Sequence, residues 1–165
     1  MHRLIPLLIG AFAAPLSLYA QQTRAVSEIN ATLDSLHQAA SKADGKRYFS
    51  LFTSSATYIG TDASEHWTIK EFREFAEPYF NKGRGWTYLP RQRQVVLPDI
   101  PCKCVAWFDE LLDSESYGTS RGTGVLVKRG DHWRIAQYAL TFPIPNDLAK
   151  GITDQIKAFE SKKKP

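Results

Sequence analysis

Four consecutive strand-like segments with short connections occupy the second half of the chain, and this pattern constrains the fold more than any other feature. The segments are rich in β-branched and aromatic residues and span residues 86–97, 105–112, 117–128 and 132–142. Turn-forming residues separate the last three, Asp113-Ser-Glu-Ser and Arg129-Gly-Asp-His, which favours hairpins. The pattern predicts a mainly antiparallel sheet.

The first half of the chain shows helical periodicity instead. Apolar residues recur at spacings of three and four, which predicts an amphipathic helix over residues 25–42. They are Val26, Ile29, Leu33, Leu36 and Ala40. A short helix is expected at residues 46–52 and a strand at 57–60. Thr68, with Glu71 three residues later, matches the capping box that begins a third helix.

A final helix is expected after Pro143-Ile-Pro-Asn-Asp, where Leu148, Ile152, Ile156 and Phe159 recur at helical spacing. Helices followed by a run of antiparallel strands imply an α+β domain, in which a curved sheet wraps one face around the helices. The expected architecture is a half-open cone.

The first twenty residues match a secretory signal peptide. Arg3 precedes a largely apolar run from Leu4 to Leu16, and Leu18-Tyr-Ala stands before Gln21. The run is shorter than the roughly 20 residues needed to span a bilayer, so we expect no membrane association after cleavage. The mature chain is expected in the periplasm or outside the cell, as one domain at residues 21–146 and a C-terminal helix with a basic tail at 147–165.

Charge and cysteine content narrow the classes of partner. The formal net charge is +4, and no basic stripe with interleaved aromatic residues occurs outside the terminal lysines, so nucleic acid is not an expected partner. The two cysteines, Cys102 and Cys104, lie too close in sequence for a Cys-x-x-Cys redox centre. In an oxidising compartment they form a local disulfide, stay free, or serve a function, and all three alternatives remain open.

Charged residues interrupt the apolar strand segments at Glu110 and Arg121. An isolated buried ion costs several kcal/mol unless it is paired, so these residues indicate a buried ion pair or a polar-lined cavity. A loop of two or four residues pairs Glu110 with Thr119 and Phe108 with Arg121, which makes Glu110 and Arg121 diagonal neighbours on one face.

The next hairpin decides which residue of the last strand joins Glu110. A two-residue turn at Gly130 and Asp131 brings Tyr138 to that face, whereas a three-residue loop brings Gln137. We favour the two-residue turn, because Gly-Asp is a plausible tight-turn pair.

Several local strings, in this order of elements, resemble the SnoaL-like branch of the nuclear transport factor 2-like superfamily. They are Ile59-Gly-Thr-Asp, Glu65-His-Trp, Gly85-Trp-Thr-Tyr, Trp107-Phe-Asp-Glu, Arg121-Gly-Thr-Gly-Val, Trp133-Arg-Ile and Tyr138-Ala-Leu-Thr. The resemblance implies a nuclear transport factor 2-like (cystatin-like) cone, a pocket between the sheet and the helices, and often a homodimer formed by sheet-to-sheet packing. The superfamily includes isomerases, dehydratases, epoxide hydrolases and binding subunits, so the resemblance leaves the activity open.

The expected site combines the strand charges with residues at the mouth of the cone. The candidate ligand-binding residues are Tyr58, Asp62, Glu65, Trp67, Glu110, Arg121 and Tyr138, and the candidate catalytic residues are Asp109 and Glu110. Each also has a structural interpretation: the Glu–Arg pair joins strands, Asp62 and Glu65 form a turn, Trp67 packs in the core, and Asp109 points outward.

We therefore expect an exported module that binds a small organic molecule, without cofactor or metal. The alternatives are a cofactor-independent isomerase, dehydratase or epoxide-hydrolase-type enzyme, and a structural or partner-binding module. His37, His66 and His132 are too scattered in the sequence to predict a triad or a metal cluster. Superfamily members that use an Asp–His pair often place the histidine on the inner sheet, where Ala139 offers no such group.

Overall fold

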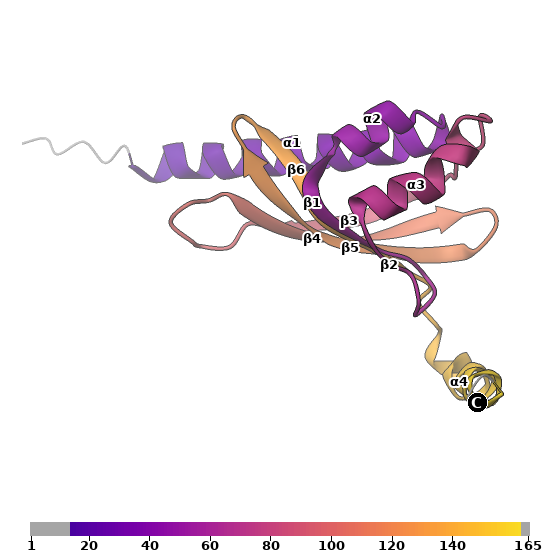
Figure 1. The fold of residues 1–165 in the computed structure, drawn as a ribbon. Helices are drawn as coiled ribbons and strands as arrows, with labels where there is room; N and C mark the ends of the chain where they lie inside the picture. The colour runs from indigo at the N-terminus through magenta and orange to yellow at the C-terminus, as the bar shows by residue number, and fades with distance from the viewer. Residues whose placement is uncertain (1–13, 163–165) are drawn as a thin grey trace, which may run out of the picture.

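Three helices lie against one face of a curved sheet in the computed structural model, which describes residues 14–162 (Figure 1). They are α1 (Ala14–Ser41), α2 (Gly45–Ser50) and α3 (Ile69–Phe80), and α4 (Asn146–Ser161) follows the last strand. The α+β class, with N-terminal helices, a curved sheet and a C-terminal helix, is confirmed. Of the expected signal peptide, residues 1–13 lie outside the described residues and 14–20 form the start of α1.

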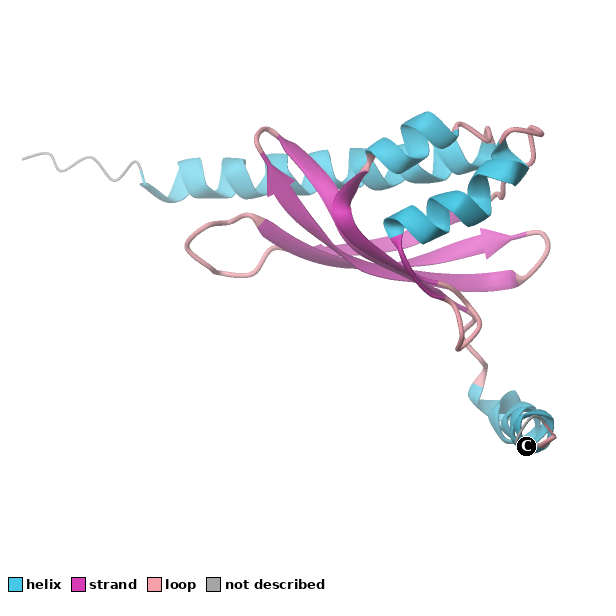
Figure 2. Cartoon of the chain, viewed as in Figure 1, coloured by secondary structure: helices cyan, strands magenta, loops and turns pink. Residues whose placement is uncertain are grey.

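Six strands form one sheet in the order β2-β1-β6-β5-β4-β3 (Figure 2). Their bounds are β1 (Phe52–Ile59), β2 (His66–Thr68), β3 (Leu89–Val96), β4 (Val105–Ser114), β5 (Gly118–Arg129) and β6 (His132–Thr141). Neighbours pair antiparallel except β1 and β6, which pair parallel. The short strand β2 was not expected from the sequence.

The capping box at the start of α3 is confirmed. The hydroxyl of Thr68 accepts a hydrogen bond from the backbone N–H of Glu71 at 3.3 Å, and the carboxylate of Glu71 accepts one from the backbone N–H of Thr68 at 2.8 Å. This reciprocal pair satisfies two backbone donors that the helix itself leaves without partners. It fixes where β2 ends and α3 begins.

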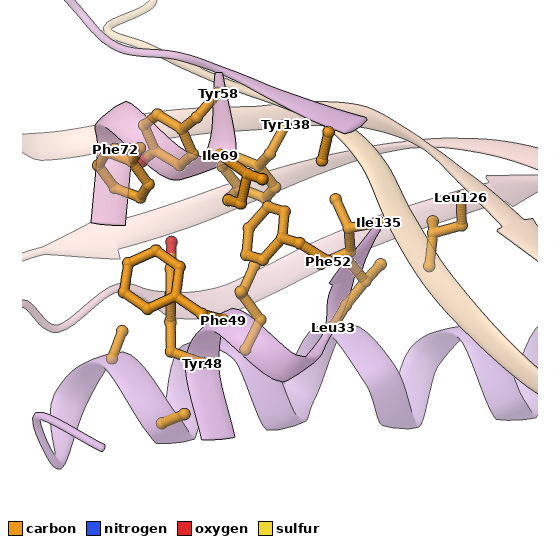
Figure 3. Close-up of a cluster of buried hydrophobic side chains, with 14 of the residues drawn as sticks. Leu33, Tyr48, Phe49, Phe52, Tyr58, Ile69, Phe72, Leu126, Ile135 and Tyr138 are labelled. Carbon is orange, nitrogen blue, oxygen red and sulfur yellow. The ribbon is translucent and has the colours of Figure 1, made fainter. Parts of the chain in front are cut away.

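Aromatic rings fill the cone between the helices and the sheet (Figure 3). The buried aromatic residues come from α2, β1, α3, β4 and β6; they are Tyr48, Phe49, Phe52, Tyr58, Phe72, Phe80, Phe108, Trp133 and Tyr138. The rings of Tyr58 and Phe72 stack with centroids 3.8 Å apart. Leu33 of α1 and Ile135 of β6 continue this core towards the N-terminal half of α1.

The β4–β5 hairpin corrects the expected register. Ser114 pairs with Gly118, so the loop has three residues, and Glu110 lies opposite Gly122 rather than Thr119. Gly118 has a φ of +68°, a conformation that glycine adopts readily and that a three-residue hairpin loop requires. Because the register moves by an odd number of residues, Glu110 and Arg121 lie on opposite faces, and the expected Glu110–Arg121 pair is wrong.

The loop between β3 and β4 contains a disulfide between Cys102 and Cys104, whose Cα atoms are 5.1 Å apart. The segment is a turn with Lys103 at a φ of +43°, not an extended strand. The turn shortens the distance to one that a disulfide spans. Of the three alternatives for these cysteines, the structure has the local disulfide.

The C-terminal helix α4 stands beyond the end of the sheet (Figure 1). None of its residues is buried. None of the helices in residues 14–162 combines the length and the apolar character needed to cross a membrane.

Candidate functional site

Glu110 lies at the centre of a hydrogen-bond network on the inner face of the sheet, and its side chain is 0 % exposed. Oε1 lies 2.8 Å from Nε2 of His37 and accepts a hydrogen bond from the Tyr138 hydroxyl at 3.0 Å. Oε2 accepts a hydrogen bond from Nε of Arg93 at 2.8 Å. We call these four residues the Glu110 network.

Secondary structure explains how the four side chains meet. His37 lies four residues after the buried Leu33, so the two side chains share the buried face of α1. Arg93 of β3 is the cross-strand partner of Glu110. Tyr138 comes from β6, two strands from β4, and reaches Glu110 across β5.

Gly122 of β5 makes this reach possible. It lies opposite Glu110, and a Cβ atom there would overlap the Tyr138 hydroxyl and stand 2.9 Å from Oε1 of Glu110. The missing side chain therefore leaves the space in which the carboxylate and the phenol meet.

The network holds Glu110 in its ionised form. Burial raises the pKa of Glu110, but the contacts with His37 and Arg93 outweigh burial, and the pKa is lowered overall. An ionised carboxylate only accepts hydrogen bonds, so Nε2 of His37 carries a proton and donates. The pKa of Tyr138 is raised well above its ordinary value by burial and then by the charge of Glu110, so Tyr138 stays protonated and donates too.

Arg93 connects this network to α1. Its Nη1 donates to the carboxylate of Asp34 at 2.8 Å and to the backbone and side-chain oxygens of Asn30 at 3.3 Å. Burial lowers the pKa of Arg93, but Glu110 and Asp34 outweigh it and raise the pKa overall. The guanidinium therefore carries a permanent charge between two carboxylates and ties the helix to β3.

A pocket of about 330 Å³ lies beside the network, between α1 and the start of β3. We call it the His37 pocket; it is lined by Asp34, His37, Gln38, Ser41, Thr87, Tyr88, Leu89 and Pro90. A larger cleft of about 470 Å³ near Gln21, Pro98 and Trp133 contains no member of the Glu110 network. His37 is thus the residue that joins the buried carboxylate to a pocket.

The second ring nitrogen of His37 is available to that pocket. In residues 14–162 the one side-chain hydrogen bond of His37 uses Nε2. The described side-chain atoms that are sealed from solvent and unpartnered belong to Thr53, Arg93, Ser120 and Trp133, not to His37. With Nε2 donating to Glu110, Nδ1 of a neutral His37 is a hydrogen-bond acceptor and a base.

Of the residues expected at the site, the structure brings Glu110 and Tyr138 together. Tyr58 is buried beside them, with its ring 5.7 Å from that of Tyr138. Trp67 is half-buried and packs on Phe72 rather than on the network. Tyr58 and Trp67 therefore belong to the aromatic core.

The remaining expected residues lie elsewhere. Arg121 and Asp109 are exposed on the outer face of the sheet, because they alternate with inward-facing neighbours along β5 and β4. Asp62 and Glu65 form the loop between β1 and β2, where the Glu65 carboxylate accepts from the backbone N–H of Asp62 at 3.1 Å. The expectation that Arg121 joins Glu110 is wrong. Asp62 and Glu65 stabilise a turn, and Asp109 points outward, as their structural interpretations had it.

Sequence reasoning missed His37 and Arg93. His37 carried a signal, because it lies on the apolar stripe of the first helix between Leu33 and Ala40. Arg93 carried a weaker one: it is a charge within a strand segment and shares the inward face with Val95. Within residues 14–162, no three His, Cys, Asp or Glu side chains come together as a metal site would require.

Residues 29–145 match the family model described as the SnoaL-like domain. None of the curated proteins compared matches the chain.

Solved structures share the fold at low sequence identity. A nuclear transport factor 2-like protein of unknown function from Pseudomonas putida is 17 % identical, with a TM-score of 0.62, over 75 % of this chain and 90 % of that one. A cystatin-like protein of unknown function from Nostoc punctiforme is 14 % identical, with a TM-score of 0.57, over 70 % and 89 %. A candidate dehydratase of the nuclear transport factor 2-like family from Streptomyces avermitilis is 10 % identical, with a TM-score of 0.63, over 75 % and 99 %. These matches confirm the expected cystatin-like cone.

Proposed function

Because the chain belongs to the SnoaL-like domain family, we propose that it binds a small organic molecule in the His37 pocket. One observation carries this proposal: His37 lines the pocket while its Nε2 is fixed on the fully buried Glu110. Functional pockets usually hold a few well-oriented polar groups among apolar walls. Here Tyr88, Leu89 and Pro90 supply the wall, and His37 supplies the oriented group.

The pocket limits the class of ligand. Its volume of about 330 Å³ lies at the lower end of the range for small-molecule sites, which favours a compact ligand of one or two rings. Nδ1 of His37 accepts hydrogen bonds, so the ligand presents a hydroxyl or an acidic C–H group there. The ligand displaces nothing from Glu110, whose two oxygens already have partners.

A proton-transfer enzyme is the second candidate, favoured by the relation between His37 and Glu110. A histidine held by a carboxylate, with its other nitrogen facing a substrate, is the arrangement that general bases use. His37 then accepts the proton, and Glu110 is the positioning residue that fixes its tautomer. The Streptomyces avermitilis protein of the same fold is described as a candidate dehydratase, which supports this class of reaction.

The test compares two histidine variants, His37→Gln in the pocket and His132→Gln in an exposed hairpin as the matched control. A panel of one- and two-ring alcohols and ketones is screened by thermal unfolding. We expect panel members to raise the Tm of the wild type and of His132→Gln, because a ligand that binds only the folded state stabilises it. The same compounds should leave His37→Gln unchanged; an equal shift in all three proteins would contradict the proposal.

The enzyme candidate needs a separate readout. For ligands that bind, exchange of carbon-bound hydrogen in D₂O, followed by NMR, reports proton abstraction. Exchange with the wild type and His132→Gln, and none with His37→Gln, is the expected result. Binding without exchange would leave the binding function standing and exclude proton transfer from the ligands tested.

Export is the third part of the proposal. The N-terminal sequence pattern supports it, and the disulfide between Cys102 and Cys104 is of the kind that persists in oxidising compartments. Mass spectrometry of the protein from fractionated cells tests it. We expect a mature N-terminus at Gln21 in the periplasm or medium; an intact Met1 in the cytoplasm would refute export.

A further inference from the structure

The cleft of about 470 Å³ at the far end of the sheet is a second candidate binding site. It lies where the N-terminal half of α1, the β3–β4 loop and the β5–β6 hairpin come together (Figure 1). We call it the Trp133 cleft; its lining residues fall within 21–28, 97–103 and 128–133. None of them lines the His37 pocket, so the two sites are separate.

The indole of Trp133 forms part of the cleft wall, and its N–H group lacks a hydrogen-bond acceptor. Trp133 is 2 % exposed, and its Nε1 is sealed from solvent without a partner among residues 14–162. A buried donor without an acceptor destabilises the fold, so such groups are rare in native proteins. A ligand oxygen in the cleft would supply the acceptor that the described chain does not.

A lysine stands beside this unpaired donor. Lys128 of β5 is the cross-strand partner of Trp133, two residues along from the buried pair of Leu126 and Ile135. Alternation along the strands therefore places Lys128 and Trp133 on the inner face. Directly opposed residues have Cβ atoms about 5 Å apart, so the ammonium group and the indole N–H can bind the same ligand group.

The disulfide turn places a second lysine at the cleft. Lys103 lies between the two bonded cysteines and lines the cleft. The carbonyl oxygen of Cys104 accepts a hydrogen bond from the backbone N–H of Lys128 at 2.8 Å, which holds the turn against β5. Neither Lys103 nor Lys128 forms an ion pair with another residue of 14–162. Two unpaired cations and one unpaired neutral donor therefore share this end of the cleft.

The acidic residues of the cleft do not occupy these donors. The carboxylate of Glu28 accepts a hydrogen bond from Nε of Arg24 at 2.9 Å. Asp99 and Asp131 are exposed, and neither pairs with a lysine in the described part of the chain. The formal charges of the lining cancel, so recognition depends on where the free donors lie rather than on the net charge.

The remaining wall of the cleft is apolar. Ala25 of α1 and Leu97 of the β3–β4 loop pack against the core and also line the cleft, together with Pro98. A hydrophobic ligand body gains free energy by leaving water for this wall. Oriented donors at one end and apolar residues beside them are the usual composition of a small-molecule site.

We infer that the Trp133 cleft binds a small organic carboxylate with an apolar body. The carboxylate accepts hydrogen bonds from the indole N–H of Trp133 and from the ammonium group of Lys128, and Lys103 adds a second positive charge. The body lies against Ala25 and Leu97. A cleft of about 470 Å³ is within the range of small-molecule sites, which suits an aliphatic acid of moderate length.

The test follows the assigned indole N–H signal of Trp133 by ¹H–¹⁵N NMR while sodium octanoate is added to the purified chain. We expect this signal to move downfield with octanoate, because its proton gains an acceptor. 1-Octanol has the same chain without the charge, and acetate has the charge without the chain, so each should bind about tenfold more weakly or worse. Equal affinity for octanoate and 1-octanol would overturn the inference, as would an indole signal that octanoate leaves unmoved.

Two lysine variants test the charged end of the cleft. Lys128 and Lys103 are exposed, so their replacement leaves the core intact. We expect Lys128→Gln to lower the affinity for octanoate about tenfold and Lys103→Gln to lower it by a smaller factor. Arg129→Gln is the matched control, because Arg129 follows Lys128 on β5 and points to the other face. Equal affinities of Lys128→Gln and Arg129→Gln would contradict the proposed contact.

His37→Gln separates this site from the His37 pocket. The variant should lose the ligands of that pocket and still bind octanoate as the wild type does, since His37 does not line the Trp133 cleft. Loss of octanoate binding in His37→Gln would place octanoate in the His37 pocket and overturn the inference.

Discussion

Glu110 combines a full charge with complete burial, which costs several kcal/mol unless each oxygen finds partners. Hydrogen bonds from three donors on three different elements offset this desolvation cost: His37 of α1, Arg93 of β3 and Tyr138 of β6. The lowered pKa of Glu110 follows from these donors outweighing burial. One carboxylate thus fixes the orientation of the histidine at the pocket and the position of α1 on the sheet.

Gly122→Ala tests how tightly this arrangement is packed. The added methyl group overlaps the Tyr138 hydroxyl, and the Tyr138 ring is held between Tyr58 and Phe108, so it cannot move aside. We expect a loss of about 1–3 kcal/mol in the free energy of unfolding, the usual cost of overpacking, measured by urea denaturation.

Gly151→Ala in α4 is the control, because a Cβ atom there meets nothing within 4 Å. It should not destabilise the domain. Equal stability of the two variants would show that the space around Tyr138 is not tightly filled.

At the scale of elements, the sequence predicts the position of a helix or strand wherever a local residue pattern specifies it. The capping box of Thr68 and Glu71 located the start of α3, and apolar periodicity located α1. Runs of β-branched and aromatic residues between turn signals located β3, β4, β5 and β6. The strand β2 has three residues, too few for any periodicity to register.

Strand register could not be derived in the same way, because one residue more or less in a loop reverses every side chain. Because the loop before Gly118 has three residues, Arg121 lies on the outer face, and the partners of Glu110 are Arg93 and His37 instead. Tyr138 lies on the face of Glu110 as expected, because two register errors cancel. The β4–β5 register differs from the expected one by three residues, and a bulge between Val125 and Leu126 changes the β5–β6 register by one. Two odd shifts together restore the original face. The role of His37 could not be predicted, because helical periodicity shows which face of α1 is buried but not which strand residue that face contacts.

At the scale of the whole molecule, the two glutamates with shifted pKa values predict the response to acid. Hydrogen bonds to Thr68 lower the pKa of Glu71, and the pKa of Glu110 is lowered although burial opposes this. A carboxyl group whose folded pKa is lowered stabilises the fold fully above its unfolded pKa of about 4.3. That contribution is lost as the pH falls through the folded pKa.

We therefore expect the free energy of unfolding to be level down to about pH 5 and to fall steeply below it. For Glu110 the slope can reach about 1.4 kcal/mol per pH unit. Urea denaturation between pH 7 and pH 3 measures this, and Glu71→Gln should show a shallower fall, since one of the two groups is gone. A flat profile down to pH 3 would contradict the assignment.

The parallel pairing of β1 with β6 has a consequence for how the chain acquires its structure. Tyr58 of β1 lies beside Tyr138 of β6, so residues 80 positions apart in sequence must find each other before the ring stack between them can close. Contacts of such long range slow folding, since loop closure has to precede the gain from packing. On the ribosome β1 therefore stays without this parallel neighbour until β6, the last strand of the sheet, has emerged.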